Sequence, residues 1–284
     1  MPIVAILLLL GSAILHTTWN LLLKRAGGKY IATWWAVLLG SAVFLPFLFI
    51  TGLPARETWL YILASVLLEV FYYFALSTAY QDADFSLVYP LARGAAPALI
   101  ALWSVLFLGE RLTTGGVFGA GIIIFGLLVI GGGNLLQPGV KKPHLHSIVL
   151  ALIIALLISL YSTIDGAAVK RTPAFSYAVI VFFLAPLLTS PLMLRHYGWP
   201  VLKSELADHL VSVVSIGLLT VFSYLLALLA FSMAPISYAG AIREVSIVLG
   251  ALAGWRFLGE RMGGLRVAGA AIIFSGILIV ALFG

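Results

Sequence analysis

Phe107-Leu108-Gly109-Glu110-Arg111 is repeated as Phe257-Leu258-Gly259-Glu260-Arg261, 150 residues further along a chain of 284 residues. An ungapped alignment of residues 107–130 with residues 257–280 keeps 12 of 24 positions identical. At the same offset upstream, Arg93 aligns with Arg243. Apolar composition can inflate such matches, but it does not generate a shared Gly-Glu-Arg. The sequence therefore predicts an internal duplication.

The composition is that of a protein that crosses a membrane many times. Hydrophobic residues make up 63% of the chain, charged residues 9%, and the mean hydropathy is +1.16, which is more apolar surface than one soluble core of this size could bury. No signal-peptide cleavage pattern stands out, so the first apolar run is expected to be a retained helix. The absence of cysteine excludes disulfides and thiolate sites. The net charge of +6 comes from residues scattered over loops, which does not favour nucleic-acid binding.

We expect an all-α integral membrane protein with ten transmembrane helices, because a span needs about 20 apolar residues. The first repeat is residues 1–133, the linker residues 134–146, and the second repeat residues 147–284. A short interfacial helix is expected between Tyr197 and Asp208. The predicted spans are Pro2 to Leu23, Tyr30 to Thr51, Trp59 to Tyr80, Phe85 to Leu108, Thr114 to Gly133, Ser147 to Val169, Ala174 to Leu194, His209 to Ser232, Pro235 to Leu258 and Gly264 to Phe283.

The spacing of the two Gly-Glu-Arg loops predicts an inverted repeat. Five crossings separate the loops, and an odd number puts them on opposite sides of the membrane. Loops after odd-numbered spans hold nine Lys and Arg residues and loops after even-numbered spans hold four. The excess of basic residues on the cytoplasmic side then predicts that both termini lie outside the cell, with the protein in the inner (plasma) membrane.

Two five-span halves, each with a Gly-Glu-Arg loop after its fourth span and Lys-Arg after its first, resemble the drug/metabolite transporter superfamily, in particular the EamA-type exporters. The chain is also similar to the YddG-like branch that exports aromatic and other neutral amino acids. The resemblance implies a transporter that works by alternating access, and it leaves the cargo open. The cargo must then be inferred from interior residues.

Four ionisable residues lie far from the predicted span ends: Glu69, Arg93, Arg243 and Glu244. Each should face the bundle interior, since a charge at the bilayer centre costs at least about 2.5–3.5 kcal/mol. One interpretation is that an arginine binds a substrate carboxylate; the other is permanent pairing, Arg93 with Glu69 and Arg243 with Glu244 or a carbonyl. Pro90 and Pro97 predict a break in the helix around Arg93.

Polar and aromatic residues recur at helical spacing on three spans. They could line a substrate path or make ordinary interhelical hydrogen bonds. Trp34, Trp35, Trp59 and Trp199 are expected in an interfacial belt. Glu110 and Glu260 are expected to cap or tether helix ends, with gating as the alternative. The stripes are Ser12, His16, Trp19 and Asn20; Glu69, Tyr73, Ser77 and Tyr80; and Ser159, Ser162, Thr163 and Gly166. The candidate substrate-binding residues are His16, Trp19, Asn20, Glu69, Tyr73, Tyr80, Ser86, Tyr89, Arg93, Ser162, Arg243 and Glu244.

The predicted function is export of neutral, often aromatic, amino acids, because arginines could meet a carboxylate in an interior that the four charges leave close to neutral. The alternatives are a proton-coupled exporter of cationic compounds, with Glu69 as the cation or proton site, and an intramembrane enzyme, for which no clustered nucleophile and base is found. A channel suits the repeat less well. We expect no cofactor and no metal. The expected partners are a small-molecule substrate, the lipid bilayer and, as an option, protons, but no nucleic acid, in a monomer or weak dimer.

Overall fold

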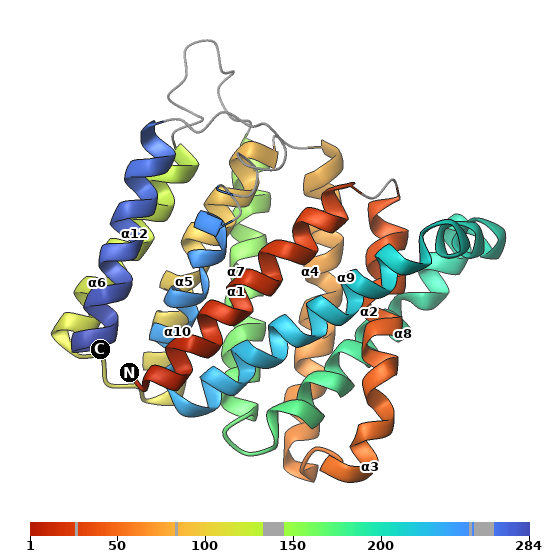
Figure 1. Ribbon diagram of the computed structural model, residues 1–284, viewed down its shortest axis with the longest axis horizontal. Coiled ribbons are helices and arrows are strands. Elements are labelled where there is room, and N and C mark those ends of the chain that lie inside the picture. Colours follow the sequence, from red (N-terminus) through yellow and green to blue (C-terminus); the bar gives the residue numbers. More distant parts are fainter. Residues whose placement is uncertain (26–27, 83–84, 133–144, 250–251, 253–263) are drawn as a thin grey trace.

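The structure is a computed structural model that describes residues 1–25, 28–82, 85–132, 145–249, 252 and 264–284, and these residues contain helices and no strand (Figure 1). The first half contains α1 (Ile3–Arg25), α2 (Lys29–Phe44), η1 (Leu45–Phe47), α3 (Leu48–Thr51), η2 (Arg56–Thr58), α4 (Trp59–Asp82), α5 (Phe85–Leu108) and α6 (Thr114–Gly132). The second half contains α7 (Leu145–Ala168), α8 (Ala174–Tyr197), α9 (Trp199–Met233), α10 (Ile236–Arg243) and α12 (Gly264–Phe283).

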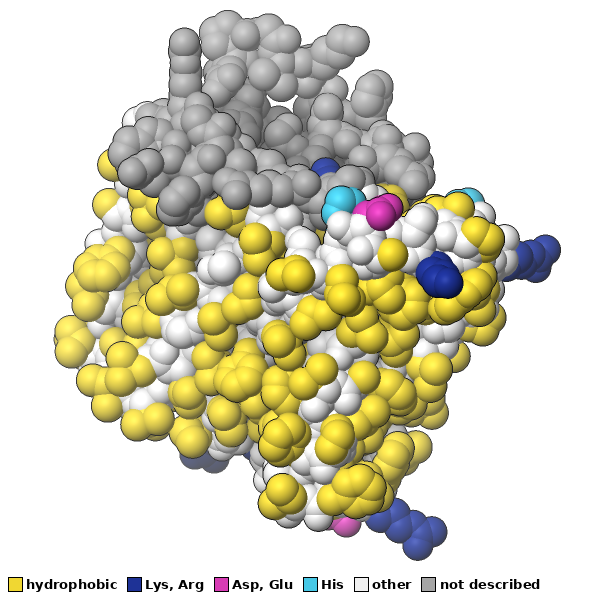
Figure 2. All heavy atoms as spheres, turned by 45° about the vertical axis from the view of Figure 1, so that its right-hand side comes forward, with side chains coloured by type: hydrophobic (Ala, Val, Ile, Leu, Met, Phe, Trp, Pro, Cys, Tyr) yellow, Lys and Arg dark blue, Asp and Glu magenta, His cyan; other side chains and the backbone are white. Residues whose placement is uncertain are grey.

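The described helices have the length and composition of membrane spans. Six helical segments are long and apolar enough to cross a bilayer, and three shorter apolar helices lie at residues 92–108, 114–129 and 267–283. Hydrophobic side chains cover most of the described part of the face in Figure 2, and few charged side chains are visible there. The protein is therefore an all-helical, multi-pass membrane protein.

The helix bounds follow the hydropathy pattern closely. Where a short interfacial helix was expected, α9 begins at Trp199 and changes direction at His209, which has the non-helical angles φ −129° and ψ 22°. Residues 199–208 thus form a separate helical segment that precedes the span. The first and last residues meet, because the Met1 amino group donates to the Gly284 carbonyl at 3.3 Å (Figure 1).

Helices α6 and α12 pack against each other in antiparallel directions. A Cβ atom at Gly119 would contact Val280 and Gly276, and one at Gly126 would contact Ile273 and Gly269. The small residues therefore allow the two backbones to approach closely. Since α6 and α12 directly follow the two Gly-Glu-Arg loops in sequence, the starts of these helices lie at opposite ends of the pair (Figure 1).

The helix neighbours come in matching sets. Helix α1 packs against α9, and α7 packs against α4; α2 packs against α9, and α8 packs against α4. The pairs α2 with α8, α5 with α10, and α6 with α12 are also in contact. Helices α1, α2, α4, α5 and α6 of the first half correspond in order to α7, α8, α9, α10 and α12 of the second half. Each contact above therefore has an equivalent contact when the two halves are exchanged.

The expected interfacial position was wrong for two of the four tryptophans. Trp34 and Trp35 are each 8% exposed and belong to a buried cluster, because their indole N–H groups donate to the carbonyls of Pro186 and Leu202, at 3.0 and 2.8 Å. Trp59 and Trp199 are 41% and 53% exposed, as a membrane-interface residue would be.

The expected break around Arg93 is also absent, since α5 is continuous.

The break in a helix occurs instead at the equivalent place in the second half. Helix α10 ends at Arg243, Glu244 follows with φ −70° and ψ −4°, and residues 245–249 are helical again. A discontinuous helix leaves backbone groups without their usual partners, and it is stable at membrane depth only when protein or a cavity surrounds it.

Candidate substrate site

Arg93 and Glu244 form an ion pair between the two halves of the chain. The Arg93 Nε atom lies 2.9 Å from Glu244 Oε2, and Arg93 Nη2 donates to the Ser246 hydroxyl at 3.2 Å. Both side chains are buried, so this pair connects α5 to the helix break beyond α10. The expected pairing of Arg93 with Glu69 was wrong, since Arg93 pairs with Glu244; the alternative pairing of Arg243 with a carbonyl stays a prediction.

Arg243 is held by an aromatic ring. Its guanidinium carbon lies 5.0 Å from the centre of the Tyr224 ring, a distance at which a cation is attracted to the ring face. In the part of the chain that the structure describes, no carboxylate lies within salt-bridge distance of Arg243. Its place in the last turn of α10 favours a cation, because the helix dipole is negative there.

Asp165 on α7 holds the Tyr224 ring in place. The hydroxyl of Tyr177 on α8 donates to Asp165 Oδ1 at 2.7 Å, and the hydroxyl of Tyr224 on α9 donates to Oδ2. Asp165 is 0% exposed. The residues from α7, α8, α9 and α10 therefore form one connected series, in which the carboxylate positions Tyr224 and Tyr224 positions Arg243.

Glu69 is buried on α4 at 4% exposure, as expected, and its Oε2 atom has no hydrogen-bond partner. Among charged groups, Asp165 and Arg243 are close enough to act on it electrostatically. Unpartnered buried oxygens are uncommon, because an unpaired polar group costs about 1–3 kcal/mol. Glu69 is therefore placed to receive a proton or a positively charged group.

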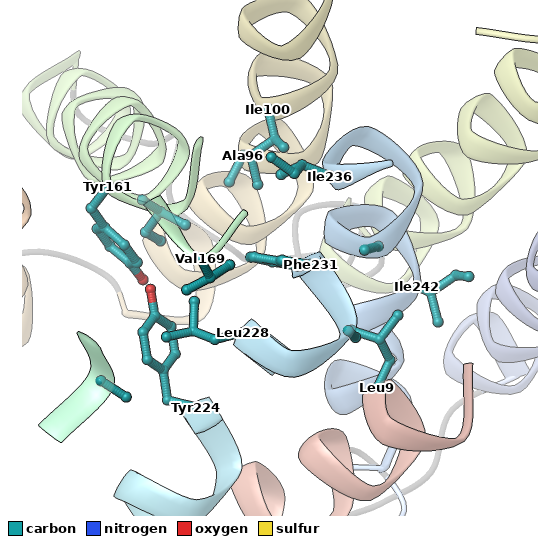
Figure 3. Packing of buried hydrophobic residues seen from close by; sticks show 14 of the residues in the cluster. Leu9, Ala96, Ile100, Tyr161, Val169, Tyr224, Leu228, Phe231, Ile236 and Ile242 are labelled. Carbon is teal, nitrogen blue, oxygen red and sulfur yellow. The ribbon is translucent and has the colours of Figure 1, made fainter. Parts of the chain in front are cut away.

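A row of aromatic rings lies beside these charged residues in the helix bundle. The ring of Tyr72 lies 5.6 Å from Tyr73 and 5.9 Å from Tyr161, and Tyr161 lies 6.5 Å from Tyr224. Phe182 completes the row at 5.0 Å from Tyr224. The hydroxyl groups of Tyr161 and Tyr224 point towards each other from α7 and α9 (Figure 3). The row lies beside Arg243 and offers ring faces to an apolar or aromatic group.

The polar stripe on α1 contains residues that pack against another helix and residues that lie near the candidate site. Ser12 and Ser223 exchange hydrogen bonds from each hydroxyl to the other's carbonyl, at 2.7 and 3.0 Å, so Ser12 joins α1 to α9. The Asn20 amide donates to the carbonyl of His16 on its own helix at 2.7 Å. His16 lies close enough to Arg93 and Arg243 for their charges to act on it electrostatically. The centres of the His16 and Trp19 rings are 5.0 Å apart, and the rings meet edge to face.

Trp19 packs against the cluster that contains Trp34 and Trp35, and its buried indole nitrogen has no hydrogen-bond partner. Ser162, at 1% exposure, likewise has an unpartnered hydroxyl and lies one turn before Asp165 on α7. The side chains of Tyr80, Ser86 and Tyr89 lie outside the part of the chain that the structure describes. Of the expected residues, the structure therefore brings together His16, Glu69, Tyr73, Arg93, Arg243 and Glu244.

Asp165 is the residue of the candidate site that sequence reasoning missed. It lies four residues before the end of the predicted sixth span, where a charge is commonly taken as interfacial, and the neighbouring stripe of Ser159, Ser162, Thr163 and Gly166 pointed to its helix face. Its presence changes the charge balance. Among the described residues, the buried ionisable side chains are two arginines and three carboxylates, so their formal charges sum to −1 when all are counted as ionised.

Glu110, from the repeated loop, caps a helix of the other half. Its carboxylate accepts hydrogen bonds from the backbone N–H groups of Ile236 and Ser237, at 2.6 and 3.2 Å, and from the Ser237 hydroxyl at 2.7 Å. Pro235 at the N-cap of α10 supplies no side-chain cap of its own. The expectation that Glu110 caps a helix end is confirmed; Glu260 lies outside the described residues.

Comparison with known proteins identifies relatives that are transporters. The sequence model of the EamA-like transporter family matches residues 3–132 and 145–282. The pseudopaline exporter CntI of Pseudomonas aeruginosa, in two strains, is 25% identical over 182 residues, which are 63% of this chain and 60% of CntI. The aligned part thus spans less than two thirds of that relative. A solved crystal structure with 20% identity matches over 98% of this chain and 97% of its own with a TM-score of 0.77, which is a likeness of fold.

Proposed function

Because the chain belongs to the EamA-like transporter family, we propose that it is a secondary transporter that exports small metabolites of the amino-acid class by alternating access. Family and relatives point to transport and not to catalysis. The location we propose is the inner (plasma) membrane, with both termini outside. A relative that exports a metabolite supports the direction of transport.

The proposed architecture is a pair of five-helix repeats, residues 1–133 and 147–284, in inverted orientation. Two observations support it: the family's sequence model matches a stretch in each half, and α6 runs antiparallel to α12. The matching helix neighbours of the two halves add further support. In such an arrangement substrates bind near the midplane, at the boundary between repeats, and rocking of one repeat against the other exposes them to each side in turn.

One observation carries the substrate class: Arg243 has no carboxylate at salt-bridge distance among the described residues while the buried Glu69 Oε2 has no hydrogen-bond donor. An amino acid supplies both missing groups, a carboxylate for Arg243 and an ammonium group for Glu69. The rings of Tyr73, Tyr72 and Tyr161 are available to its side chain. A neutral, often aromatic, amino acid is therefore the substrate that we propose first.

A second candidate is an exporter of cationic compounds, and Asp165 is the observation that favours it. With Asp165 included, the buried carboxylates outnumber the buried arginines by one among the residues that the structure describes, and a cation would balance this difference. Nucleotide sugars and sugar phosphates fit less well, because their negative charge would add to it.

The test is counterflow of radiolabelled solutes in proteoliposomes, with a panel of neutral, aromatic and basic amino acids, nucleotides and cationic dyes. Wild type is compared with Arg243→Gln and Trp19→Ala, with Glu57→Gln at an exposed position as the matched control. Arg93→Gln is included to separate a structural ion pair from a binding residue. We expect amino-acid counterflow in wild type and the control, and at least a tenfold loss in Arg243→Gln, since one charge-assisted contact is worth about 1.5–3 kcal/mol.

Absence of amino-acid counterflow in well-folded wild type rejects the substrate class, and counterflow of cationic dyes alone replaces it with the second candidate. Full activity in Arg93→Gln, Arg243→Gln and Trp19→Ala together rejects the site.

A further inference from the structure

We propose that the loop of residues 109–113 is a latch between the two halves of the chain, and that Glu110 must leave the start of α10 before the bundle opens on that side. This inference rests on the alternating-access transport proposed above, and it assigns one step of that cycle to named residues. It gives the Gly-Glu-Arg motif of the first half a role beyond capping.

The latch holds α10 through the side chain of Glu110 and the backbone of Thr113. The Glu110 carboxylate accepts hydrogen bonds from the first two backbone N–H groups of α10 and from the Ser237 hydroxyl. The Thr113 N–H group donates to the Tyr238 hydroxyl at 2.7 Å, and Lys170 lies 3.6 Å from Glu110. All of these partners belong to the second half of the chain. An ordinary helix cap, by contrast, comes from the residue next to the helix.

The backbone of the loop turns the Glu110 side chain towards these partners. Gly109 has φ +66°, a left-handed angle that glycine adopts without strain. The Glu110 N–H group donates to the Ser104 carbonyl at 3.1 Å, which fixes the turn at the end of α5. The Glu110 side chain is only 8% exposed. The motif therefore supplies both the turn and the carboxylate of an inter-half contact.

Helices α5 and α10 are in contact and run in opposite directions. The latch joins the end of α5 to the start of α10, and Arg93 on α5 pairs with Glu244 beyond the end of α10. Between these two contacts, a Cβ atom at Gly240 would lie 3.7 Å from the Cβ atom of Ile100. The two backbones approach closely at this point. It is the pivot, where the helices stay together while their latch ends separate.

Buried apolar side chains close the space at the pivot. Ala96 and Ile100 of α5 lie beside Ile236 of α10 (Figure 3), and each of the three is at most 3% exposed. Eight residues separate Ile100 from Leu108, about 12 Å along the helix. A rotation of about 15° at the pivot would therefore move the latch end by roughly 3 Å. That movement is as long as a hydrogen bond, so the bonds of Glu110 would break together.

The strength of the latch suits a contact that is released in every cycle. A helix cap of this kind changes an equilibrium by a factor of about 5 to 30. Such a factor is large enough to favour one of two conformations and small enough for the differential binding of a substrate to overcome. The latch thus biases the bundle towards closure at this end without locking it.

The first experiment ties the latch shut. In this cysteine-free chain, Glu110→Cys with Ser237→Cys replaces two groups that are 2.7 Å apart, within reach of a short, reductant-cleavable bifunctional thiol reagent. Crosslinking should abolish counterflow, and a reductant should restore it. The matched control is a disulfide at the pivot, Ile100→Cys with Gly240→Cys, because their Cβ separation of 3.7 Å suits a disulfide and the shorter side chain at position 100 makes room. This disulfide should leave counterflow unchanged. Counterflow that survives the latch crosslink, or equal loss in both pairs, overturns the proposal.

The second experiment needs no substrate. Ser104→Cys is a conservative change at a residue that is 0% exposed and lies on α5 between the pivot and the latch. A small thiol reagent, added from the side on which the chain termini lie (Figure 1), should react with it only in the open conformation. Glu110→Ala should speed this reaction about 5- to 30-fold. Ser237→Ala removes one of the three hydrogen bonds and should speed it about 2- to 10-fold. Equal rates with and without Glu110 contradict the latch.

A second reporter separates opening from general loosening. Ser41 is also 0% exposed, on α2, which packs against α8 and α9. The reaction of Ser41→Cys should not accelerate in Glu110→Ala, and equal acceleration at both positions would mean local unfolding and overturn the latch. If no solute shows counterflow in the wild type, the proposed transport function fails, while the thiol rates still decide on the latch.

Discussion

Removing the charge of Glu244 should destabilise the protein strongly, because it removes the carboxylate that pairs with the buried Arg93 guanidinium. The two side chains are 4% and 8% exposed and 2.9 Å apart. Breaking a buried ion pair by removing one partner costs about 3–5 kcal/mol. A change of 1 kcal/mol shifts the unfolding midpoint by about 2–4 °C in chains of 150–250 residues. We therefore expect Glu244→Gln to lower the midpoint by roughly 6–20 °C.

The relative stabilities of three variants test this explanation further. Arg93→Gln leaves a carboxyl group, which can accept a proton and become neutral, whereas Glu244→Gln leaves a guanidinium, which cannot lose one. Arg93→Gln should therefore be the milder change. The double variant Arg93→Gln with Glu244→Gln has no buried charge at either position and should be more stable than Glu244→Gln alone.

The assay is a heat challenge of detergent-solubilised protein followed by size-exclusion chromatography, with Glu57→Gln as the exposed-carboxylate control. A Glu244→Gln variant within about 2 °C of wild type, or a double variant as unstable as Glu244→Gln, would refute the view that the pair is a structural contact between the halves. Arg93 would then return as a candidate for binding the substrate carboxylate.

Three further outcomes are expected. Glu110→Ala should destabilise the protein by about 1–2 kcal/mol in the same heat challenge, since it removes the cap of α10, whereas Lys170→Ala should change stability by less than about 1 kcal/mol, because Lys170 is 42% exposed and lies 3.6 Å from Glu110; equal effects would contradict the cap. Gly217→Ala should reduce the yield of folded protein, because its Cβ would overlap the Ala36 carbonyl oxygen, while Gly121→Ala on α6, with nothing within 4 Å, should not; the reverse order would exclude close packing of α2 on α9. Single cysteines at Arg111 and Arg261, introduced into a chain that has none, should react with impermeant thiol reagents from opposite sides of the membrane; labelling from one side would rule out the inverted repeat.

Local sequence predicted the helices well because each span is a continuous run of apolar residues. Lipid accepts only segments whose backbone is fully hydrogen-bonded, so such a run becomes a helix wherever it lies. For the same reason Glu69, Arg93, Arg243 and Glu244 were correctly expected to be buried, since none of them is near the end of a span. The capping role of Glu110 followed from its place beside a helix end.

The partners of these residues were decided only by the packing of the helices. Arg93 and Glu244 are 151 positions apart in the chain, and nothing in the apolar pattern of α5 or α10 says that their faces meet. Asp165 was overlooked because a charge near a span end is usually interfacial, and it is buried here because Tyr177 and Tyr224 reach it from two other helices. Hydropathy determines which segments enter the bilayer, since transfer into lipid depends on each segment alone. The ion pair, the helix break and the burial of Asp165 depend on the relative position of several helices, which only the tertiary structure determines.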